Sequence, residues 1–484
     1  MSELSATSDL TANRRGARGV AIAALALSCL TGCAGPAQSD LDAWRQVDRA
    51  RFSDGHTAAT HGLDYAPGVE EPRPLPDDAA LDDYVRYAMR HSPALEAAYY
   101  RWRAAMERVP QARALPDPEL GFGFVLDQVD RDSERMGERY SISQMFPWFG
   151  KLDLRGDIAL ANAQAEAQRF EAVRLGLADR VTRAWFEYAW LHQAAATARD
   201  NRDLLGRLES VARSRFRVGA VSQADVNRAQ VELGRLDDQA RSLEDMLGPA
   251  AAELNAVLGR PAHAPLPGAA VAPSKQSIEA LPERTDEEWL TLARQRNPEL
   301  AASRHEVTRE RQSMALARKD YYPDIMLGLE YARGGSARMA MMDGGGSDML
   351  VGMISVTVPI RRGRYDAGVR EARARLDAAA RAVEDREVSL GAALKGALFT
   401  YRDSARRLRL YGGTLVPTAR QSMATTEVAY RTGTAGFSDL VDAQRVLLEF
   451  ELARERAAAD RAGALTRVRA LVGDAIQRDP GPEP

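Results

Sequence analysis

The chain has 484 residues, with 65 basic and 68 acidic side chains and a formal net charge of −3. Because the basic residues are spread among the acidic ones, the sequence has no basic patch, and nucleic-acid binding is excluded. The only cysteines are Cys29 and Cys33, so the rest of the chain has no disulfide, thiolate metal site or cysteine nucleophile. No phosphate-binding glycine loop, paired metal-binding histidines or nucleophile with a base is found. We therefore expect neither an enzyme nor a cofactor.

The N-terminal residues have the pattern of an export signal. Arg14, Arg15 and Arg18 precede an apolar stretch that ends at Leu30 and is too short to span a membrane. The small residues before Cys33 resemble the lipobox of bacterial lipoproteins, in which the cysteine carries a covalent lipid and becomes the mature N-terminus. We expect residues 1–32 to be the lipoprotein signal peptide and residues 33–78 to be an N-terminal extension. An ordinary signal peptide is the alternative.

The remaining sequence is a tandem duplication. Ser92–Leu95 returns as Asn297–Leu300, 205 positions later, and Phe216–Gly219 returns as Tyr430–Gly433, 214 positions later. A period near 200 residues indicates two copies of a domain-sized unit. The expected domains are a first repeat, a linker rich in Ala, Pro and Gly, a second repeat and a disordered tail: 79–262, 263–284, 285–475 and 476–484.

Each repeat contains two segments in which apolar residues alternate with small or polar ones, which is typical of strands. In the first repeat, Leu120, Phe122 and Phe124 alternate with glycines, and Ile142 and Phe146 alternate with serines. The second repeat has the same pattern at seven apolar positions: Ile325, Leu327, Leu329, Tyr331, Ile354, Val356 and Val358. The pattern fits a barrel wall with lipid outside and water inside. It also fits a half-buried sheet of a water-soluble protein.

The number of strands favours an assembly of several chains. After the signal, no stretch of 18 or more apolar residues occurs, so any membrane crossing must use strands. Four strands cannot close a barrel, and an open sheet edge cannot be left in lipid. Three chains would supply about twelve strands, so a homotrimer is expected.

The other segments are helical in composition. A helix is expected over residues 153–218, about 100 Å long at 1.5 Å per residue, with its interior face at alternate alanines from Ala159 to Ala167. Its counterpart over 365–431 is expected to bend or break at its glycines and proline. These residues are Gly391, Gly396, Gly412, Gly413 and Pro417. Turns at 218–222 and 432–438 lead to return helices, and two short helices precede the strands of each repeat, at 81–90 and 95–109 and at 287–296 and 300–317.

The duplicated order resembles the TolC-like outer membrane efflux proteins over residues 80–475. The most specific parts are the paired Ser/Asn-Pro-x-Leu segments and the sequences after the two turns, Asp225–Gln230 and Asp439–Gln444. The resemblance implies a mostly α-helical fold with long antiparallel helical hairpins and four strands per chain. In a homotrimer these would form an α-barrel across the periplasm and a twelve-stranded β-barrel in the outer membrane. The implied function is passive conduction in a tripartite (RND-type) efflux system, with a periplasmic adaptor, or membrane fusion protein, and an inner-membrane pump as partners.

The same resemblance places both helix turns at the periplasmic tip. Five tip residues would contact the adaptor or pump: Val218, Gly219, Asp225, Gly433 and Thr434. Asp439 and Asp442, with Tyr430 before the turn, would form the gate, because three symmetry copies bring like carboxylates together. The alternative for Asp439 is that it only stabilises a helix N-terminus. Ala435 stands where the family pattern has a basic residue, so an arginine latch at this position is not expected.

Methionines in and beside the glycine-rich loop 334–348 bear on the substrate. Met339, Met341 and Met342 lie in the loop and Met349 and Met353 follow it. Thioethers suit Cu(I) or Ag(I), although flexible methionines also fill gaps. The corner Phe146–Lys151 resembles that of family members linked to heavy-metal efflux. Heavy-metal cations are therefore one predicted substrate class. The alternatives are a multidrug or type I secretion conduit, or a non-channel periplasmic adaptor or coiled-coil lipoprotein.

Overall fold

The computed structural model describes residues 75–76, 79–124, 138–219, 221–267, 280–333 and 349–474. The chain divides into two units, Met1–Gly68 and Val69–Pro484, and all the described residues belong to the second. The signal peptide with Cys33, most of the extension, the loop methionines Met339, Met341 and Met342, and the tail 476–484 lie outside the described residues.

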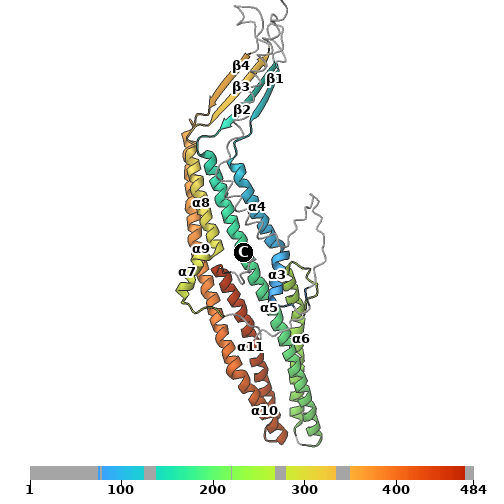
Figure 1. Ribbon diagram of the computed structural model, residues 1–484. Helices are drawn as coiled ribbons and strands as arrows, with labels where there is room; N and C mark the ends of the chain where they lie inside the picture. Colours follow the sequence, from blue (N-terminus) through green and yellow to red (C-terminus); the bar gives the residue numbers. More distant parts are fainter. Residues whose placement is uncertain are drawn as a thin grey trace, which may run out of the picture. The chain divides into compact units, whose positions relative to one another are not determined.

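The described elements confirm the duplication (Figure 1). The first repeat consists of α3 (Leu81–His91), α4 (Pro93–Arg113), β1 (Glu119–Phe124), β2 (Glu138–Phe146), α5 (Lys151–Arg217) and α6 (Gln223–Leu258). The second repeats this order with α7 (Asp286–Arg296), α8 (Pro298–Lys319), β3 (Ile325–Arg333), β4 (Met349–Val356), α9 (Arg362–Leu410), a π-helical segment η2 (Tyr411–Leu415), α10 (Val416–Thr432) and α11 (Phe437–Val472). Each repeat is therefore two short helices, two strands and a long helical hairpin.

The duplicated Ser/Asn-Pro segments start equivalent helices. Ser92 caps α4 by accepting a hydrogen bond from the N–H of Leu95, and the Asn297 side chain caps α8 by accepting one from Leu300 at 2.9 Å. The proline that follows each cap lies at the first helical position, where its missing N–H costs no intrahelical hydrogen bond. The two motifs thus mark the same corner in each repeat.

The four strands form one antiparallel sheet in the order β1-β2-β3-β4. Leu120 pairs with Ile142 and Ile142 pairs with Leu329, so the apolar positions of the two repeats share one face, as predicted. This face is exposed in the chain, and Leu120 keeps 80% of its accessible surface. The prediction was wrong for Val358, which lies beyond β4. Among the described residues, no helix is both long and apolar enough to cross a membrane.

The long helix of the first repeat is continuous over its 67 residues, as predicted, but its equivalent in the second repeat is not. There α9 runs through Gly391 and Gly396 without a break, which corrects the expectation at these positions. A helical glycine costs only about 1 kcal/mol relative to alanine, and Gly391 packs near the side chain of Leu290. The interruption falls at η2, just before Pro417, whose ring and missing N–H disrupt the α-helical hydrogen bonds of the preceding turn.

The alanines of α5 are buried for a different reason from the one expected. Ala161, Ala163 and Ala165 are buried, whereas Ala159 and Ala167 are only partly so. Residues two apart cannot share one face of a helix with 3.6 residues per turn. They are covered on different sides, because α5 packs against α4 and also against α8. The expected single interior stripe is therefore wrong.

Equivalent glycines terminate the return helices in the two repeats. Gly259 ends α6 with φ 75°, and Gly473 ends α11 with φ 83°. A Cβ built on Gly259 would lie 2.8 Å from the carbonyl oxygen of His91, the last residue of α3, and one built on Gly473 would lie 2.2 Å from that of Arg296, the last residue of α7. In both repeats the return helix therefore ends with its backbone directly against the end of the first short helix.

We predict that Gly473→Ala destabilises the protein by at least about 1–2 kcal/mol, because alanine disfavours a positive φ and its Cβ would displace Arg296. Thermal unfolding of the full chain in detergent measures the effect. The matched control is Gly396→Ala in α9, where no atom lies within 4 Å of the added Cβ. The control should be neutral or slightly stabilising, and equal melting temperatures for the two variants would contradict the prediction.

Candidate functional site

The two long helical hairpins turn at the end of the helices away from the sheet (Figure 1). Gly219 and Gly433 occupy these turns with φ of 72° and 83°, a conformation that glycine adopts without a Cβ penalty. In the second turn, the N–H of Thr434 donates to the carbonyl of Ala429 at 2.9 Å and that of Gly433 donates to Tyr430 at 3.2 Å, a Schellman arrangement. The side chain of Val218 is 79% exposed and Thr434 is also exposed. Both turns are therefore accessible in the chain.

The acidic residues after the turns cap the return helices. Asp225 is the third residue of α6 and exchanges hydrogen bonds with Ser222 in a capping box. Asp439 is the third residue of α11 and accepts a hydrogen bond from the N–H of Gly436 at 2.9 Å. Asp442 lies one turn further on, with its side chain 71% exposed and 3.8 Å from Arg445. The two exposed carboxylates, Asp439 and Asp442, therefore lie on one side of α11, and Asp439 also stabilises the helix N-terminus.

Tyr430 lies in the core between the two hairpins and keeps only 1% of its accessible surface. Its ring meets that of Phe437 edge to face, with 5.7 Å between centroids. Burial raises the pKa of its hydroxyl above the ordinary value, and the nearby guanidinium of Arg215 opposes this only in part. Side chains from all four hairpin helices form this core: Leu205, Leu208 and Ala212 from α5, Ala229 and Leu236 from α6, Met423 and Tyr430 from α10, and Phe437, Leu440, Val441 and Leu448 from α11.

Arg215 of α5 links the first hairpin to the end of α10. Its guanidinium donates to the carbonyl oxygen of Tyr430 at 2.5 Å and to that of Arg431 at 3.3 Å, and it lies 5.1 Å from the centroid of the Tyr430 ring. The carbonyls at a helix C-terminus carry partial negative charge and have no intrahelical partner. A basic group thus contacts this turn although Ala435 is not basic, and it comes from the other repeat.

An ion pair with a buried carboxylate joins the hairpins about two turns further along the return helices. Glu232 of α6, 2% exposed, accepts hydrogen bonds from both Nε, at 2.9 Å, and Nη2 of Arg445 on α11, and Arg235 lies 3.3 Å away. The hydrogen bonding from Arg445 lowers the pKa of Glu232 below its ordinary value although burial opposes this. Nearby, the side chain of Gln444 donates to the carbonyl oxygen of Asn201 at 3.0 Å.

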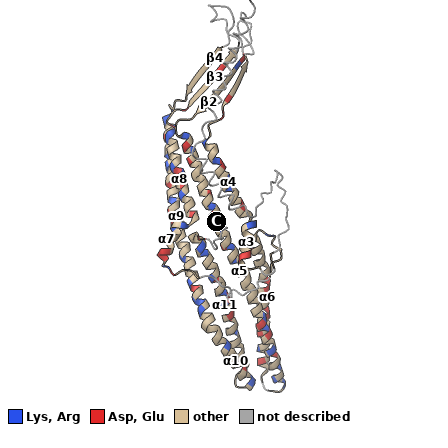
Figure 2. Cartoon of the chain, in the orientation of Figure 1, with Lys and Arg blue, Asp and Glu red and all other residues tan. Residues whose placement is uncertain are grey.

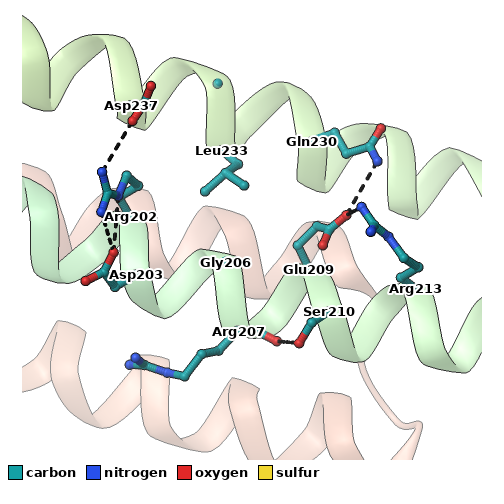
Figure 3. Close-up of a pocket in the computed structure, with 11 residues that line it drawn as sticks. Arg202, Asp203, Gly206, Arg207, Glu209, Ser210, Arg213, Gln230, Leu233 and Asp237 are labelled. Atoms are coloured by element: carbon teal, nitrogen blue, oxygen red, sulfur yellow. Dashed lines mark hydrogen bonds and ion pairs between the residues drawn. The ribbon is translucent and has the colours of Figure 1, made fainter.

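A polar groove of about 850 Å³ lies between α5 and α6 of the first hairpin (Figure 3). Arg202 lies at one end and bridges Asp203 at 2.8 Å and Asp237 at 3.4 Å. At the other end, Glu209 binds Arg213 and accepts from Gln230 at 3.5 Å. Leu233 lies between these two polar groups (Figure 3), and no atom lies within 4 Å of a Cβ built on Gly206 or Gly234.

Sequence reasoning found the turns but missed both Arg215 and the groove. A signal for the groove was present, because Gly206 and Gly234 interrupt segments of strong helix formers on helices that face each other. No local signal distinguishes Arg215 from its neighbours, since its partners are more than 200 positions away. Basic and acidic side chains are interspersed along the long helices (Figure 2). In the described part of the chain, no group of three His, Cys, Asp or Glu side chains is arranged to hold a metal ion.

The fold and the paired turns define a duplicated protein in which each repeat contributes two strands and one long helical hairpin. The outer membrane efflux protein family matches residues 85–260 and 289–474, which cover most of both repeats. The chain therefore belongs to the outer membrane efflux protein family.

Individual relatives agree with this assignment. Protein CyaE of Bordetella pertussis is 28% identical over 306 residues, 61% of this chain and 64% of its own length, so the chain matches just under two thirds of this relative. The cobalt-zinc-cadmium resistance protein CzcC of Cupriavidus metallidurans is 24% identical over 387 residues, 78% of this chain and 86% of its own. The open-state structure of the MtrE outer membrane channel of Neisseria gonorrhoeae has the same fold, with a TM-score of 0.68 at 20% identity over 82% of this chain and 90% of MtrE.

We predict that Arg215→Ala loosens the end of α10, because it removes charge-assisted hydrogen bonds to the helix carbonyls. Such a bond contributes about 1.5–3 kcal/mol, so amide hydrogen exchange over residues 426–434 should accelerate by on the order of tenfold or more. Mass spectrometry of the full chain measures this exchange. The control is Arg217→Ala, because Arg217 contacts only Ser214 of its own helix among the hydrogen bonds found for it. Unchanged exchange in Arg215→Ala would contradict the prediction.

We predict that the Glu232–Arg445 pair makes the stability of the fold depend on pH in the acidic range. A carboxylate with a lowered pKa stabilises the fold above its unfolded pKa, about 4.3 for Glu, and this stabilisation is lost as the pH falls through the lowered value. Glu232→Gln should therefore lower the melting temperature at pH 7 and flatten its decrease towards acid. Glu371→Gln, at an exposed ion pair within α9, should change neither. A pH profile equal to that of the parent protein in Glu232→Gln would show that the pair does not contribute.

Proposed function

We propose that this chain is the outer-membrane channel of a tripartite, RND-type efflux system, through which substrate passes from an inner-membrane pump and a periplasmic adaptor. The observation that carries the proposal is the sheet. One face bears exposed apolar side chains such as Leu120, Phe122 and Ile354. The other bears small and polar side chains such as Gly121 and Ser143, together with four methionines of β2, β3 and β4. This is the composition of a barrel wall between lipid and water.

A homotrimer completes the barrel. The edge strands β1 and β4 of the described sheet each have one side without a strand partner, and such edges are not tolerated in lipid. Three copies would pair β1 of one chain with β4 of the next and close about twelve strands. The long hairpins would then stand together as a helical tube on the periplasmic side, with Cys33 as a lipid anchor at the mature N-terminus.

The turns and the groove between α5 and α6 support an adaptor at the periplasmic end. Val218, Gly219, Asp225, Gly433 and Thr434 would make the first contacts at the tip. In the groove, no atom lies within 4 Å of a Cβ built on Gly206 or Gly234. This space would allow a helix of another protein to approach α5 and α6 closely. The ion pairs at its two ends offer partners for a polar helix, so the groove fits a helical hairpin of an adaptor better than an apolar ligand.

The gate proposed for the closed channel combines both repeats. Asp439 and Asp442 would form a ring of carboxylates around the three-fold axis, where like charges repel one another. Tyr430 would act from the core, because its ring and carbonyl hold Arg215. Opening then requires the second hairpin to part from the first at Arg215 and Arg445.

For the substrate, we propose heavy-metal cations. Support comes from the resistance to cobalt, zinc and cadmium named for CzcC and from the corner Phe146–Lys151. A multidrug or type I secretion conduit is the second candidate, because a passive tube does not by its shape select a substrate. The family assignment and the exposed sheet disfavour a periplasmic adaptor or a simple coiled-coil lipoprotein.

We predict that the mature protein, extracted from outer membranes in mild detergent, has the mass of a lipidated trimer and conducts ions in planar bilayers. Leu329→Arg, on the apolar face, should prevent insertion, because arginine at mid-membrane on the lipid face costs about 2–4 kcal/mol in each copy. Ser143→Arg, on the opposite face, should insert and change the conductance instead. A membrane-free monomer, or equal behaviour of the two variants, would contradict the channel.

Loss of metal tolerance on gene deletion, with drug tolerance unchanged, would support the proposed substrate.

A further inference from the structure

All four methionines of the described strands lie on the same face of the sheet. Met145, Met326, Met349 and Met353 share the register positions of Ser143, Gly328 and Glu330, opposite to the exposed apolar face. On the proposed function, this face lines the water-filled interior. The sequence placed Met349 and Met353 beside the glycine-rich loop, and in the structure both lie in β4.

Three of these methionines are neighbours on adjacent strands. Met145 of β2 stands directly opposite Met326 of β3, and Met353 of β4 stands opposite Gly328, two residues from Met326. Directly opposed side chains have Cβ atoms about 5 Å apart, and diagonal neighbours about 7–8 Å apart, within reach of long side chains. The three flexible thioethers can therefore converge on one point above β3.

Gly328 makes room for this convergence. A Cβ built on Gly328 would lie 3.4 Å from Cε and 3.7 Å from Cβ of Met353, so the Met353 side chain lies over the β3 backbone in the space that the glycine leaves. The three side chains are not a packed core, because Met145 and Met353 keep 36% and 41% of their accessible surface. Apolar side chains so exposed gain little from burial.

The surroundings of the methionines offer few competing ligands. Glu330 is the carboxylate of β3 on this face, and it lies 3.7 Å from Arg139 of β2, on the side away from Met326. Ser143, Val351 and Ser355 are the neighbours of the methionines on their own strands and this face, and Glu119 of β1 stands opposite Ser143, diagonal to Met145. A cation that prefers carboxylate ligands therefore has one carboxylate beside the site, whereas three thioethers favour soft Cu(I) and Ag(I).

We propose that Met145, Met326 and Met353 form a thioether site for a soft monovalent cation, Cu(I) or Ag(I), on the channel-lining face of the sheet. The position of the site inside a channel rests on the proposed function. A trimer would present three such sites at one level. Exchange among several weak sites lets an ion enter and also leave, as conduction requires.

The test is an Ag(I) titration of the purified full-length protein in detergent, followed through the ¹³C-methyl signals of its methionines. We expect the signals of Met145, Met326 and Met353 to shift together and saturate first. Replacing any one of the three with leucine should weaken binding on the order of tenfold or more, and the triple variant should abolish it. Zn(II) and Co(II) should leave these signals unchanged.

Met246→Leu is the matched control, because Met246 of α6 is 45% exposed and far from the sheet in sequence. Gly328→Val should also weaken binding, because it fills the space under Met353 without removing a thioether. If Met246 responds at the same Ag(I) concentration as the three strand methionines, or if none responds, the site is wrong.

Conductance separates this proposal from the proposed function. A triple variant that conducts K⁺ like the parent protein but does not bind Ag(I) supports a thioether site within an intact channel. A parent protein that conducts but does not bind Ag(I) overturns the site alone. A parent protein that binds Ag(I) through the three residues but does not conduct retains the site and overturns the channel.

Discussion

In an antiparallel sheet, an edge strand leaves half of its backbone N–H and C=O groups without a strand partner, and β1 and β4 are the two edges of the described sheet. The apolar face of the same sheet is exposed along all four strands. Both features are unfavourable for an isolated chain in water, and the first is prohibitive in lipid. On the proposed function, copies of the chain would meet this constraint by pairing edge to edge.

The long helices hold the two repeats together so that their strands can form one sheet. At the sheet end, Asp324 before β3 accepts from the N–H of Trp148 and from Lys151, both at 2.8 Å, across the repeats. At the far end, Arg215 and Arg445 make the corresponding cross-repeat contacts. Each contact joins a charged side chain to a helix end, a turn or a buried partner, so the repeats are fixed to one another at both ends of the helices.

The alternation of apolar residues and the tandem duplication made most of the fold predictable from the sequence. The alternation around Leu120 and Ile325 specified the strands and their apolar face, and the two Ser/Asn-Pro motifs specified the helix starts, because both signals are local. The contacts of Arg215 and Glu232 were not predictable, since they join residues more than 200 positions apart whose types are common along the helices. The prediction of a bend or break at Gly391 was wrong for the opposite reason. A local helix-breaking residue was present, but the packing of α9 outweighed it.

The π-helical segment Tyr411–Leu415 has a consequence for helical phase. From Arg362 to Thr432 the helix of the second repeat has 71 residues, whereas α5 of the first has 67. In an unbroken α-helix, four additional residues would rotate everything beyond them by about 400°, which is about 40° more than one revolution. A π turn holds more residues per revolution than an α turn, so η2 offsets this excess rotation. The additional residues therefore amount to about one revolution and lengthen the helix of the second repeat by about 6 Å.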